Sequence, residues 1–331
     1  MEDGEPFAAI VEDYGDQIDE VYFAWPGQPS GRPAIGSHNG GYTPDEIRVQ
    51  LLNELQLFRK VGIKLDLLLN ANCYGEQAIS VAFEKAIITI LRNLDSRGCK
   101  PDIVTTTSMM VARTVKTFFP DIEIRASVNM RIGTIQAMHY LTDLFDSFYL
   151  QRDLQRNIRY LGKIRSWCKE NGKKLCILAN SGCLRFCPCQ TFHDNLIAHC
   201  AGIEQQNNIA GWNPHLCWNL YKDPVNFSQI LKATWIRPED IDRYAGPDDT
   251  VKLATRQHTN PRMVIGAYAK RRYDGNLLDL FEPGFSPAFA PRFIDNTAFP
   301  ADWSERTSTC NGECESCSYC DTVLKQVMRS F

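Results

Sequence analysis

Short apolar runs alternate with amphipathic segments along most of the chain, and this alternation is the strongest structural signal in the sequence. Runs rich in aliphatic and β-branched residues predict strands, whereas apolar residues spaced three and four apart predict helices. Eight segments predict strands, and a predicted helix follows most of them: residues 18–26, 64–70, 102–108, 122–130, 145–151, 173–180, 233–240 and 250–256.

The predicted helices carry recognisable end signals. Thr43 and Glu46 form a capping-box pattern around Pro44 in the first turn, and Gly62 ends the same helix. The last helix is expected over residues 260–275, where an Asn-Pro pair begins it and a glycine ends it. These signals divide the chain into repeated strand–helix units.

The order of these units predicts the fold. Eight strand–helix units in one register predict an α/β protein with a closed (β/α)8 TIM barrel over residues 1–281. The main alternative is an open doubly wound sheet, but no glycine-rich phosphate loop follows the first strand. Residues 282–331 are rich in proline and aromatic residues without periodicity, which predicts an extended C-terminal arm.

Polar residues follow most of the predicted strands. In a parallel barrel the carboxyl ends of all strands meet at one rim, and that rim holds the chemistry. Any one of these residues alone would be an ordinary loop residue, but together they predict a site for a polar, anionic small molecule or a nucleic-acid base. They are Asn70, Asn72, Asn129, Arg131, Asp153, Asn180, Arg237, Glu239, Asp240, Lys252 and Arg256.

Composition indicates the cellular location of the protein and the partners that its charge favours. The chain has 331 residues, of which 44 % are apolar, so a continuous core is expected. No apolar run reaches membrane-spanning length, and the acidic start MEDGEPFAAI shows no signal peptide, so a cytoplasmic protein is expected. The net charge of −3 gives no support for nucleic acid as a partner, although it leaves a local basic cleft open.

Thirteen cysteines are unusual for such a chain. In a reducing compartment they do not form a disulfide framework. Cys99, Cys168 and Cys176 lie among apolar neighbours and are expected to be buried core thiols. Most of the others are clustered and need another explanation.

The first cluster follows the sixth predicted strand, where Cys183, Cys187 and Cys189 stand close to His193. A cysteine nucleophile with a histidine base would need only one thiol, and crowded thiolates repel one another without a cation. Zinc accepts sulfur and nitrogen ligands, whereas iron–sulfur clusters take thiolates almost exclusively. The spacing therefore favours an iron–sulfur cluster over zinc at the rim.

Several motifs together resemble a known family. NSGCLRFCPCQTFHDN (residues 180–195), Cys217, TWIRPEDIDRY (residues 234–244) and VKLATR (residues 251–256) are similar to the collagenase-like family, peptidase family U-thirty-two. The resemblance spans residues 19–280. It implies a barrel and, as in several members, one [4Fe–4S] cluster held by four cysteines. It also implies oxygen-independent hydroxylation of ubiquinone precursors or RNA bases, with prephenate as oxygen donor in some members.

The resemblance assigns the ligands of the rim cluster. Cys183, Cys187 and Cys217 match the family's ligand positions best. The fourth ligand is expected to be Cys73, which follows the second strand, with Cys200 as its rival. Cys189 departs from the family pattern and is interpreted as a spare thiol.

A second cluster lies in the C-terminal arm, where four cysteines fall within residues 310–320 at spacings that suit one metal centre. Zinc sites usually separate two cysteine pairs by a longer loop, whereas short spacings of two and three are typical of ferredoxin-like clusters. A second [4Fe–4S] cluster is therefore favoured over zinc, and the resemblance does not account for this site. The expected ligands are Cys310, Cys314, Cys317 and Cys320.

These observations predict an iron–sulfur enzyme that performs oxygen-independent hydroxylation or related redox chemistry on a polar small molecule or RNA base. A peptidase or hydrolase and a non-catalytic iron–sulfur partner subunit are the alternatives; the chain has no HExxH motif. The expected partners are an anionic substrate and an electron donor or paired homologous subunit. Catalysis is assigned to His193, Arg237, Glu239 and Arg256, and substrate binding to Asn72, Asn129, Arg131, Asn180 and Lys252.

Overall fold

A computed structural model describes residues 6–32 and 43–331 of the chain. These residues form two compact units. The N-terminal unit contains the chain up to Tyr149 together with Gln190–Trp212, and the C-terminal unit contains Leu150–Cys189 and Asn213–Phe331. The predicted boundary after residue 281 is a different division, and it stays a prediction.

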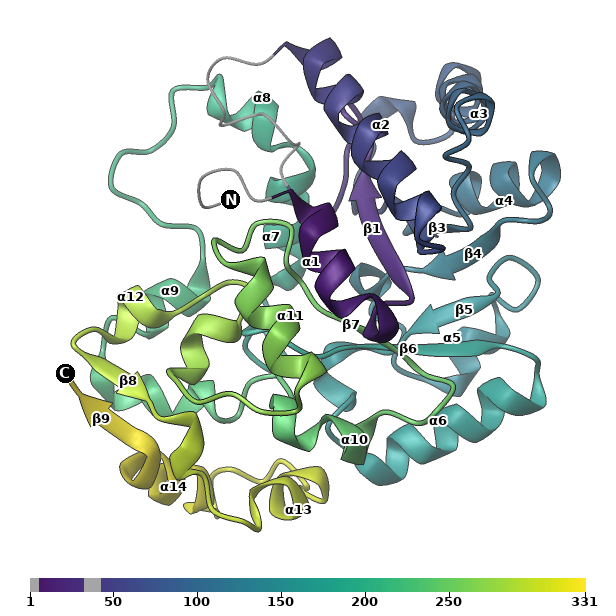
Figure 1. Cartoon of the computed structure of the whole chain (residues 1–331). Helices are drawn as coiled ribbons and strands as arrows, with labels where there is room; N and C mark the ends of the chain where they lie inside the picture. The colour runs from purple at the N-terminus through teal and green to yellow at the C-terminus, as the bar shows by residue number, and fades with distance from the viewer. Residues whose placement is uncertain (1–5, 33–42) are drawn as a thin grey trace. The chain divides into compact units, whose positions relative to one another are not determined.

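Five parallel strands form the sheet of the N-terminal unit (Figure 1). Each strand pairs with the next one along the chain, with Val21 opposite Leu65 and Val104 opposite Ile124, for example. The first five predicted strands are thereby confirmed, in shorter form. They are β1 (Glu20–Ala24), β2 (Lys64–Leu69), β3 (Ile103–Thr106), β4 (Glu123–Ala126) and β5 (Ser147–Tyr149).

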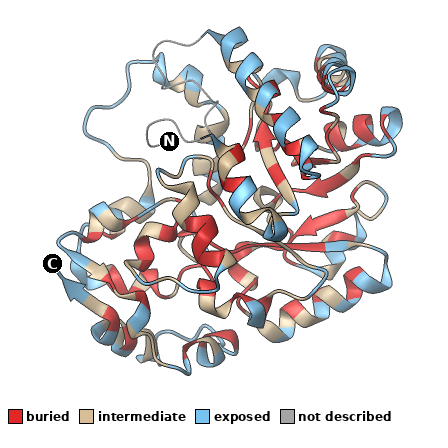
Figure 2. Cartoon of the chain, viewed as in Figure 1, coloured by how far each residue is buried: buried red, intermediate tan, exposed pale blue. Residues whose placement is uncertain are grey.

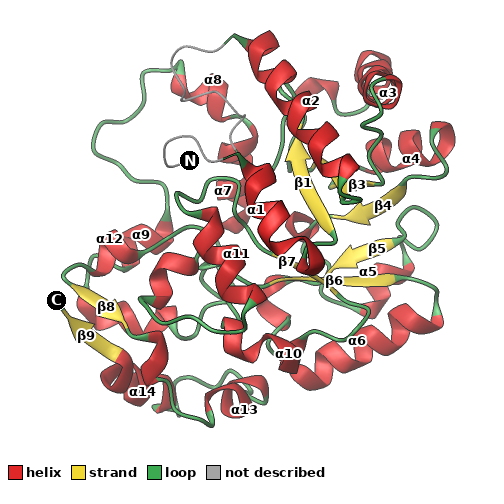
Figure 3. Ribbon diagram, in the orientation of Figure 1, coloured by secondary structure: helices red, strands yellow, loops and turns green. Residues whose placement is uncertain are grey.

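Helices separate these strands along the chain (Figure 3). The predicted capping box of the second helix is confirmed, because Thr43 Oγ1 accepts from the Glu46 amide and Glu46 accepts from the Thr43 amide at 2.7 Å. The helices are α1 (Phe7–Tyr14), α2 (Pro44–Lys60), α3 (Val81–Ser96), α4 (Met109–Phe118), α5 (Ile135–His139), α7 (Gln190–Ala198) and α8 (Cys200–Glu204).

The C-terminal unit contains two parallel strands, β6 (Lys174–Leu178) and β7 (Thr250–Lys252), with Ile177 opposite Val251. Two further strands, β8 (Arg292–Ile294) and β9 (Met328–Ser330), form an antiparallel pair. Its helices are α6 (Ile158–Glu170), α9 (Leu216–Leu220), α10 (Ile241–Tyr244), α11 (Pro261–Ala269), α12 (Ser286–Phe289), α13 (Trp303–Ser308) and α14 (Tyr319–Val327).

Short 3-10 helices complete both units. They are η1 (Gly15–Gln17), η2 (Gly75–Gln77), η3 (Val128–Met130), η4 (Arg152–Leu154), η5 (Pro224–Ile230), η6 (Pro238–Asp240), η7 (Leu277–Leu280) and η8 (Asn296–Ala298). Many of them stand directly after a strand or before a helix, where they turn the chain.

The seventh predicted strand is wrong. Residues 233–240 form no strand, although the Ile236 amide donates to the Ala179 carbonyl at 2.8 Å. The side-chain amide of Gln155 donates to the Thr234 carbonyl at 2.7 Å, and Pro238, which has no amide hydrogen, starts η6. The Gln155 side chain thus bonds a carbonyl that a neighbouring strand would otherwise bond. The described residues therefore contain seven parallel strands, β1 to β7, rather than eight.

Mixed α/β structure with parallel strands, which is consistent with a TIM-like fold, is confirmed. The last predicted helix is shorter than expected, because α11 ends at Ala269. Cys99, expected in a helix, lies just beyond α3. Closure of the barrel stays a prediction.

The C-terminal arm has more regular structure than its sequence indicated, so the extended arm is a wrong prediction for much of residues 282–331. Three helices and both antiparallel strands lie within it. Trp303 in α13 is 2 % exposed and stacks on Trp235 with ring centroids 5.8 Å apart. Val323 and Val327 of α14 are buried as well. Aromatic packing therefore anchors this part of the chain without hydrophobic periodicity in the sequence.

The apolar strands form the core, and Figure 2 shows them mostly in red for buried residues. Leu65, Leu67 and Leu69 of β2 have no exposed surface, as expected for a strand covered on both faces. Cys99, Cys168 and Cys176 are buried thiols, as the sequence predicts. Among the described residues, no helix combines the length and the apolar character that a membrane span requires.

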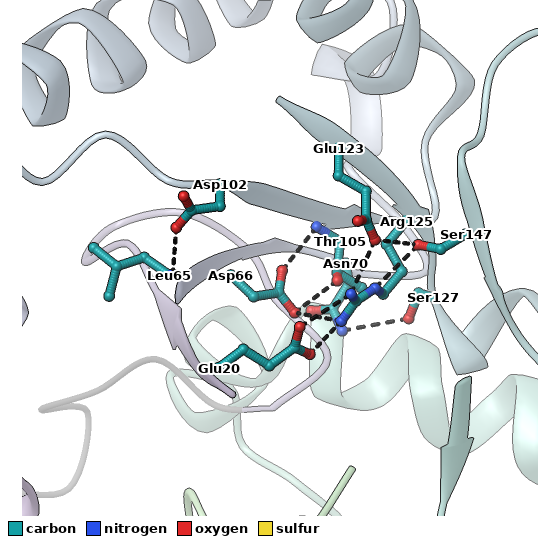
Figure 4. Close-up of polar contacts among 10 residues, drawn as sticks. All are labelled: Glu20, Leu65, Asp66, Asn70, Asp102, Thr105, Glu123, Arg125, Ser127 and Ser147. Carbon is teal, nitrogen blue, oxygen red and sulfur yellow. Dashed lines mark hydrogen bonds and ion pairs between the residues drawn. The ribbon is translucent and has the colours of Figure 1, made fainter. Parts of the chain in front are cut away.

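A buried arginine gathers carboxylates inside the N-terminal sheet (Figure 4). Arg125 in β4 is 1 % exposed. Its guanidinium bonds both carboxylate oxygens of Glu20 in β1, Oε2 at 3.1 Å, and donates to Glu123 Oε1 at 2.9 Å and to Ser147 Oγ at 3.1 Å. Asp66 in β2 stands 3.9 Å from the same group. Charged side chains and the Ser147 hydroxyl thus join four of the five strands of this unit.

Candidate functional site

Three thiols of the C-terminal unit gather beside the end of β6. Cys183 and Cys187 lie in the loop that follows β6, and Cys217 lies in α9. Burial, with smaller contributions from the neighbouring Cys183 and Cys187, raises the pKa of Cys217 to about 12. Burial also raises the pKa of Cys187. Cys183 and Cys187 act electrostatically on Cys217, and Cys183 and Cys189 act on Cys187, so these cysteines lie near one another, and their assignment to one cluster stays a prediction.

Asp153 holds the loop that carries two of these thiols. This carboxylate, which is 5 % exposed, accepts from the Phe186 amide, and its backbone carbonyl accepts from Arg185 Nε at 2.9 Å. Phe186 has a left-handed backbone with φ 53°, a conformation that side chains other than glycine rarely adopt. The loop is therefore fixed in an unfavourable local conformation by a buried side chain of its own unit.

Arg152 brings a positive charge to the cluster. It is 7 % exposed, and its Nη1 donates to Cys183 Sγ at 3.1 Å and to Ser181 Oγ at 3.3 Å. A guanidinium stabilises a thiolate or any other anionic sulfur group next to it. The site can thus hold negative charge on sulfur.

Tyr221 supplies a buried hydroxyl that has no hydrogen-bond partner within residues 6–32 and 43–331. Its side chain has no exposed surface, and its ring packs against Phe285 and Phe289. Burial raises the pKa of Tyr221, and Cys217 and Cys183 raise it further. A buried hydroxyl without a partner costs free energy, so this donor beside two cysteines fits a sulfur-rich group that accepts its hydrogen bond.

The donor set fits a thiolate-bound iron–sulfur cluster in its chemistry: three sulfur ligands, a guanidinium and a free hydroxyl donor. As placed, however, no three Cys, His, Asp or Glu side chains within residues 6–32 and 43–331 enclose a metal site. Both candidates for the fourth ligand, Cys73 after β2 and Cys200 in α8, belong to the N-terminal unit. The choice between them stays a prediction.

Two predicted substrate residues of the N-terminal unit share one carboxylate. Asn72 Nδ2 and Arg131 Nη2 donate to Asp194 Oδ2 at 3.0 and 3.3 Å, and Arg131 Nη1 donates to Thr191 Oγ1 at 2.7 Å. Arg131 has a left-handed backbone with φ 53°, and Asn72 Oδ1 and Arg131 Nε are buried without a partner. These hydrogen bonds connect the loops after β2 and β4 to α7. Asn72 Oδ1 and Arg131 Nε are polar atoms that a ligand could bond.

Asn129, the next predicted substrate residue, lies beside Asn70 in a tight polar corner. Asn129 Nδ2 and the Asn70 carbonyl are 3.4 Å apart, and Asn70 Oδ1 accepts from the Gly31 amide at 2.9 Å. A side chain at Gly31 would bring its Cβ within 2.7 Å of Asn129 Nδ2, so the Asn129 side chain would have to move. His193 stands half-buried in α7, one residue before Asp194.

Replacing Asp194 by alanine is expected to lower the free energy of unfolding by about 1–3 kcal/mol, because two donors lose a partly buried charged acceptor. Urea unfolding at neutral pH measures this change. Asp274→Ala is the matched control, since Asp274 is 56 % exposed in its pair with Arg272, and an effect under about 0.5 kcal/mol is expected. Equal effects in both variants would show that Asp194 does not hold α7.

The remaining predicted residues lie in the C-terminal unit. Asn180 has no exposed surface, donates to the Ala254 and Leu280 carbonyls and accepts from the Ala254 amide. Lys252 ends β7, and its carbonyl accepts from the Ala179 amide. Arg256 lies in the turn beyond β7. In the structure Asn180 thus joins backbone segments, and its role in substrate binding stays a prediction.

Arg237 and Glu239 form an ion pair at 3.2 Å, next to the aromatic ring of Phe299. Glu239 Oε1 also accepts from the Tyr273 amide at 2.7 Å and from Asn296 Nδ2 at 2.8 Å. Both side chains are therefore largely engaged within their own unit, and their catalytic assignment stays a prediction.

Sequence reasoning missed three residues of these sites. Arg152 follows a predicted strand but was not singled out. Tyr221 stands four residues after Cys217, so one helical turn places them on the same face. Asp194 is adjacent to His193 in the sequence, but nothing in the sequence shows that two loops converge on it.

The chain matches no protein-family model. It is similar to a protein of Methanocaldococcus jannaschii named "Uncharacterized protease MJ1657", with 25 % identity over 289 residues that cover 84 % of this chain and 81 % of the relative. The solved structure of the U32 peptidase Mk0906 superposes with a TM-score of 0.52 and 15 % identity, over 73 % of this chain and 87 % of that one.

Proposed function

We propose that the chain is an enzyme whose reaction centre is built on Cys183, Cys187 and Cys217. The chain resembles the collagenase-like family, peptidase family U-thirty-two, and both relatives confirm this resemblance. The names of the relatives support a peptidase or hydrolase at the level of the family, which was the alternative drawn from the sequence. The finer proposal is an iron–sulfur enzyme that carries out oxygen-independent hydroxylation or related redox chemistry.

The single observation that carries this proposal is the trio of half-buried thiols, in which Cys183 and Cys187 act electrostatically on Cys217, beside the hydroxyl of Tyr221, which has no hydrogen-bond partner among the described residues. Hydrolysis by a cysteine nucleophile needs one thiol and leaves the other two unexplained. When bound, an iron–sulfur cluster supplies one-electron chemistry. The three cysteines would hold it, Arg152 would donate a hydrogen bond to the Cys183 sulfur, and Tyr221 would donate one to a sulfur acceptor.

The proposed substrate is a polar or anionic small molecule or an RNA base. In the N-terminal unit, Asn72 and Arg131 each keep a buried polar atom unpartnered at the carboxyl ends of the strands. Arg131 carries a fixed positive charge, which suits a carboxylate or a phosphate. The proposal also includes a separate electron donor or a paired homologous subunit as the partner. It places the protein in the reducing cytoplasm.

A hydrolase is the second candidate, and one contact favours it besides the names of the relatives. Arg152 lies 3.1 Å from Cys183 Sγ and would favour the nucleophilic thiolate of that residue. In this case Cys187 and Cys217 are not needed for the reaction.

Three serine variants separate the two candidates. The iron–sulfur proposal expects Cys183→Ser, Cys187→Ser and Cys217→Ser each to lose the iron of this centre, and neither the wild type nor any variant to hydrolyse casein or gelatin. If the protein is a hydrolase, the wild type would cleave casein or gelatin, and among the three variants only Cys183→Ser would lose that activity. Cleavage that survives in Cys187→Ser and Cys217→Ser would overturn the iron–sulfur proposal.

A further inference from the structure

The four cysteines of the C-terminal arm lie on a segment held at both ends. Residues 309–318 contain neither helix nor strand, and they connect α13 to α14. Trp303 of α13 and Val327 of α14 are buried. Cys310, Cys314 and Cys317 are exposed, whereas Cys320 is half-buried in the first turn of α14. A free loop between two fixed helices can close around a ligand without unfolding the unit.

The thiols already interact within this segment. Cys320 interacts electrostatically with Cys310 and Cys314. The Gly312 amide donates to Cys310 Sγ at 3.4 Å, and Gly312 adopts a left-handed backbone with φ 83°. Glycine adopts such a turn without steric cost, and it directs an amide hydrogen at the first sulfur.

A buried guanidinium lies beside Trp303 of α13, the helix that precedes this segment. Arg156 is 8 % exposed and forms no ion pair with a carboxylate among the described residues. Its Nη1 donates to the Leu231 and Ala233 carbonyls at 3.1 and 2.9 Å, and the guanidinium lies 5.2 Å from the Trp235 ring and 5.4 Å from the Trp303 ring. It interacts electrostatically with Cys320 and Cys310.

A second cation, the ammonium group of Lys232, lies near the first turn of α14. Lys232 interacts with Cys320 and stands 4.0 Å from Asp321 in α14. Charges are rarely buried without a partner, because desolvation costs several kcal/mol. Neutral thiols would leave the charge of Arg156 without an anionic partner among the sulfurs, whereas thiolates would provide one.

We propose that Cys310, Cys314, Cys317 and Cys320 form a thiolate-bound metal centre whose negative charge is compensated by Arg156 and Lys232. Four thiolates around one Zn²⁺ or one iron–sulfur cluster leave a net charge of about −2. Each thiol releases its proton to solvent as its sulfur binds the metal. The sulfurs do not enclose a metal as placed, so the segment 309–318 closes on binding. This centre is independent of the reaction proposed above.

Point substitutions test this centre better than truncation, because removal of residues 302–331 would also expose Trp235. Cys314→Ser and Cys317→Ser change exposed residues, so folding should persist. We expect each to lose one centre per chain in metal analysis of protein purified without oxygen, while Ser316→Ala, in the same segment, keeps it. Loss of zinc alone identifies a zinc site, and joint loss of iron and sulfide identifies a cluster.

The role of Arg156 is tested with Co²⁺ added to metal-free protein. We expect Arg156→Met to weaken cobalt binding tenfold or more, Arg156→Lys to weaken it less, and Arg272→Met, at an exposed site, to leave it unchanged. Equal affinity in Arg156→Met and the wild type would overturn the charge compensation. Unchanged zinc, iron and sulfide in both cysteine variants would overturn the metal centre itself.

Discussion

Replacing Arg125 by methionine is expected to lower the free energy of unfolding by about 3–5 kcal/mol, the range for breaking a buried ion pair from one side. The guanidinium is the cation that meets Glu20, Glu123 and Asp66 inside the N-terminal sheet. Methionine fills a similar volume but leaves these carboxylates without a positive charge. The loss of stability therefore comes from buried carboxylates that lack a cation rather than from a cavity.

Urea unfolding followed by circular dichroism measures this effect. Arg272→Met serves as the control, because Arg272 is 73 % exposed in its pair with Asp274, and a change under about 1 kcal/mol is expected. Adding Glu20→Gln and Glu123→Gln to Arg125→Met should restore part of the stability. If Arg125→Met is no more destabilising than Arg272→Met, the network does not stabilise the sheet.

Cys187→Ser is expected to remove all iron and sulfide of the rim centre while the helical content stays close to that of the wild type. A serine hydroxyl is a poor substitute for a thiolate that bridges a loop to a cluster. Cys187 is half-buried in a loop held by Asp153, so the substitution leaves the core of the unit intact. Iron, acid-labile sulfide and far-ultraviolet circular dichroism provide the readout.

Cys189→Ser is the matched control, since Cys189 lies in the same loop and is not assigned as a ligand. It should keep its full iron and sulfide content. Equal loss in both variants would mean that the loop folds badly without its thiols. Full retention in Cys187→Ser would remove this residue from the centre.

Local patterns predicted the strands because their signals are contiguous in the sequence. The run LDLLL became β2, and the cap at Thr43 holds α2 as expected. The segment around Trp235 was mistaken for a strand, because its apolar composition did not show that the Gln155 side chain takes its hydrogen bonds. Hydrogen bonds between side chain and backbone over long sequence separations leave no periodic pattern.

The same limit applies to the arm and the sites. Trp235 and Trp303 stack on each other, yet neither belongs to an amphipathic repeat, so the arm seemed extended from its sequence alone. Cysteine spacing was enough to group Cys183 with Cys187. The hydroxyl of Tyr221 and the carboxylate of Asp194 become informative only once folding shows what surrounds them.

The most direct measurement is the iron and acid-labile sulfide content, together with the electron paramagnetic resonance spectrum, of the wild-type protein purified without oxygen and then reduced with dithionite. An iron–sulfur centre on Cys183, Cys187 and Cys217 predicts iron and sulfide in equal amounts and the loss, in Cys217→Ser, of the cluster signal that this centre contributes. A wild-type protein that contains no sulfide after reconstitution with iron and sulfide, or a signal unchanged in Cys217→Ser, would contradict it.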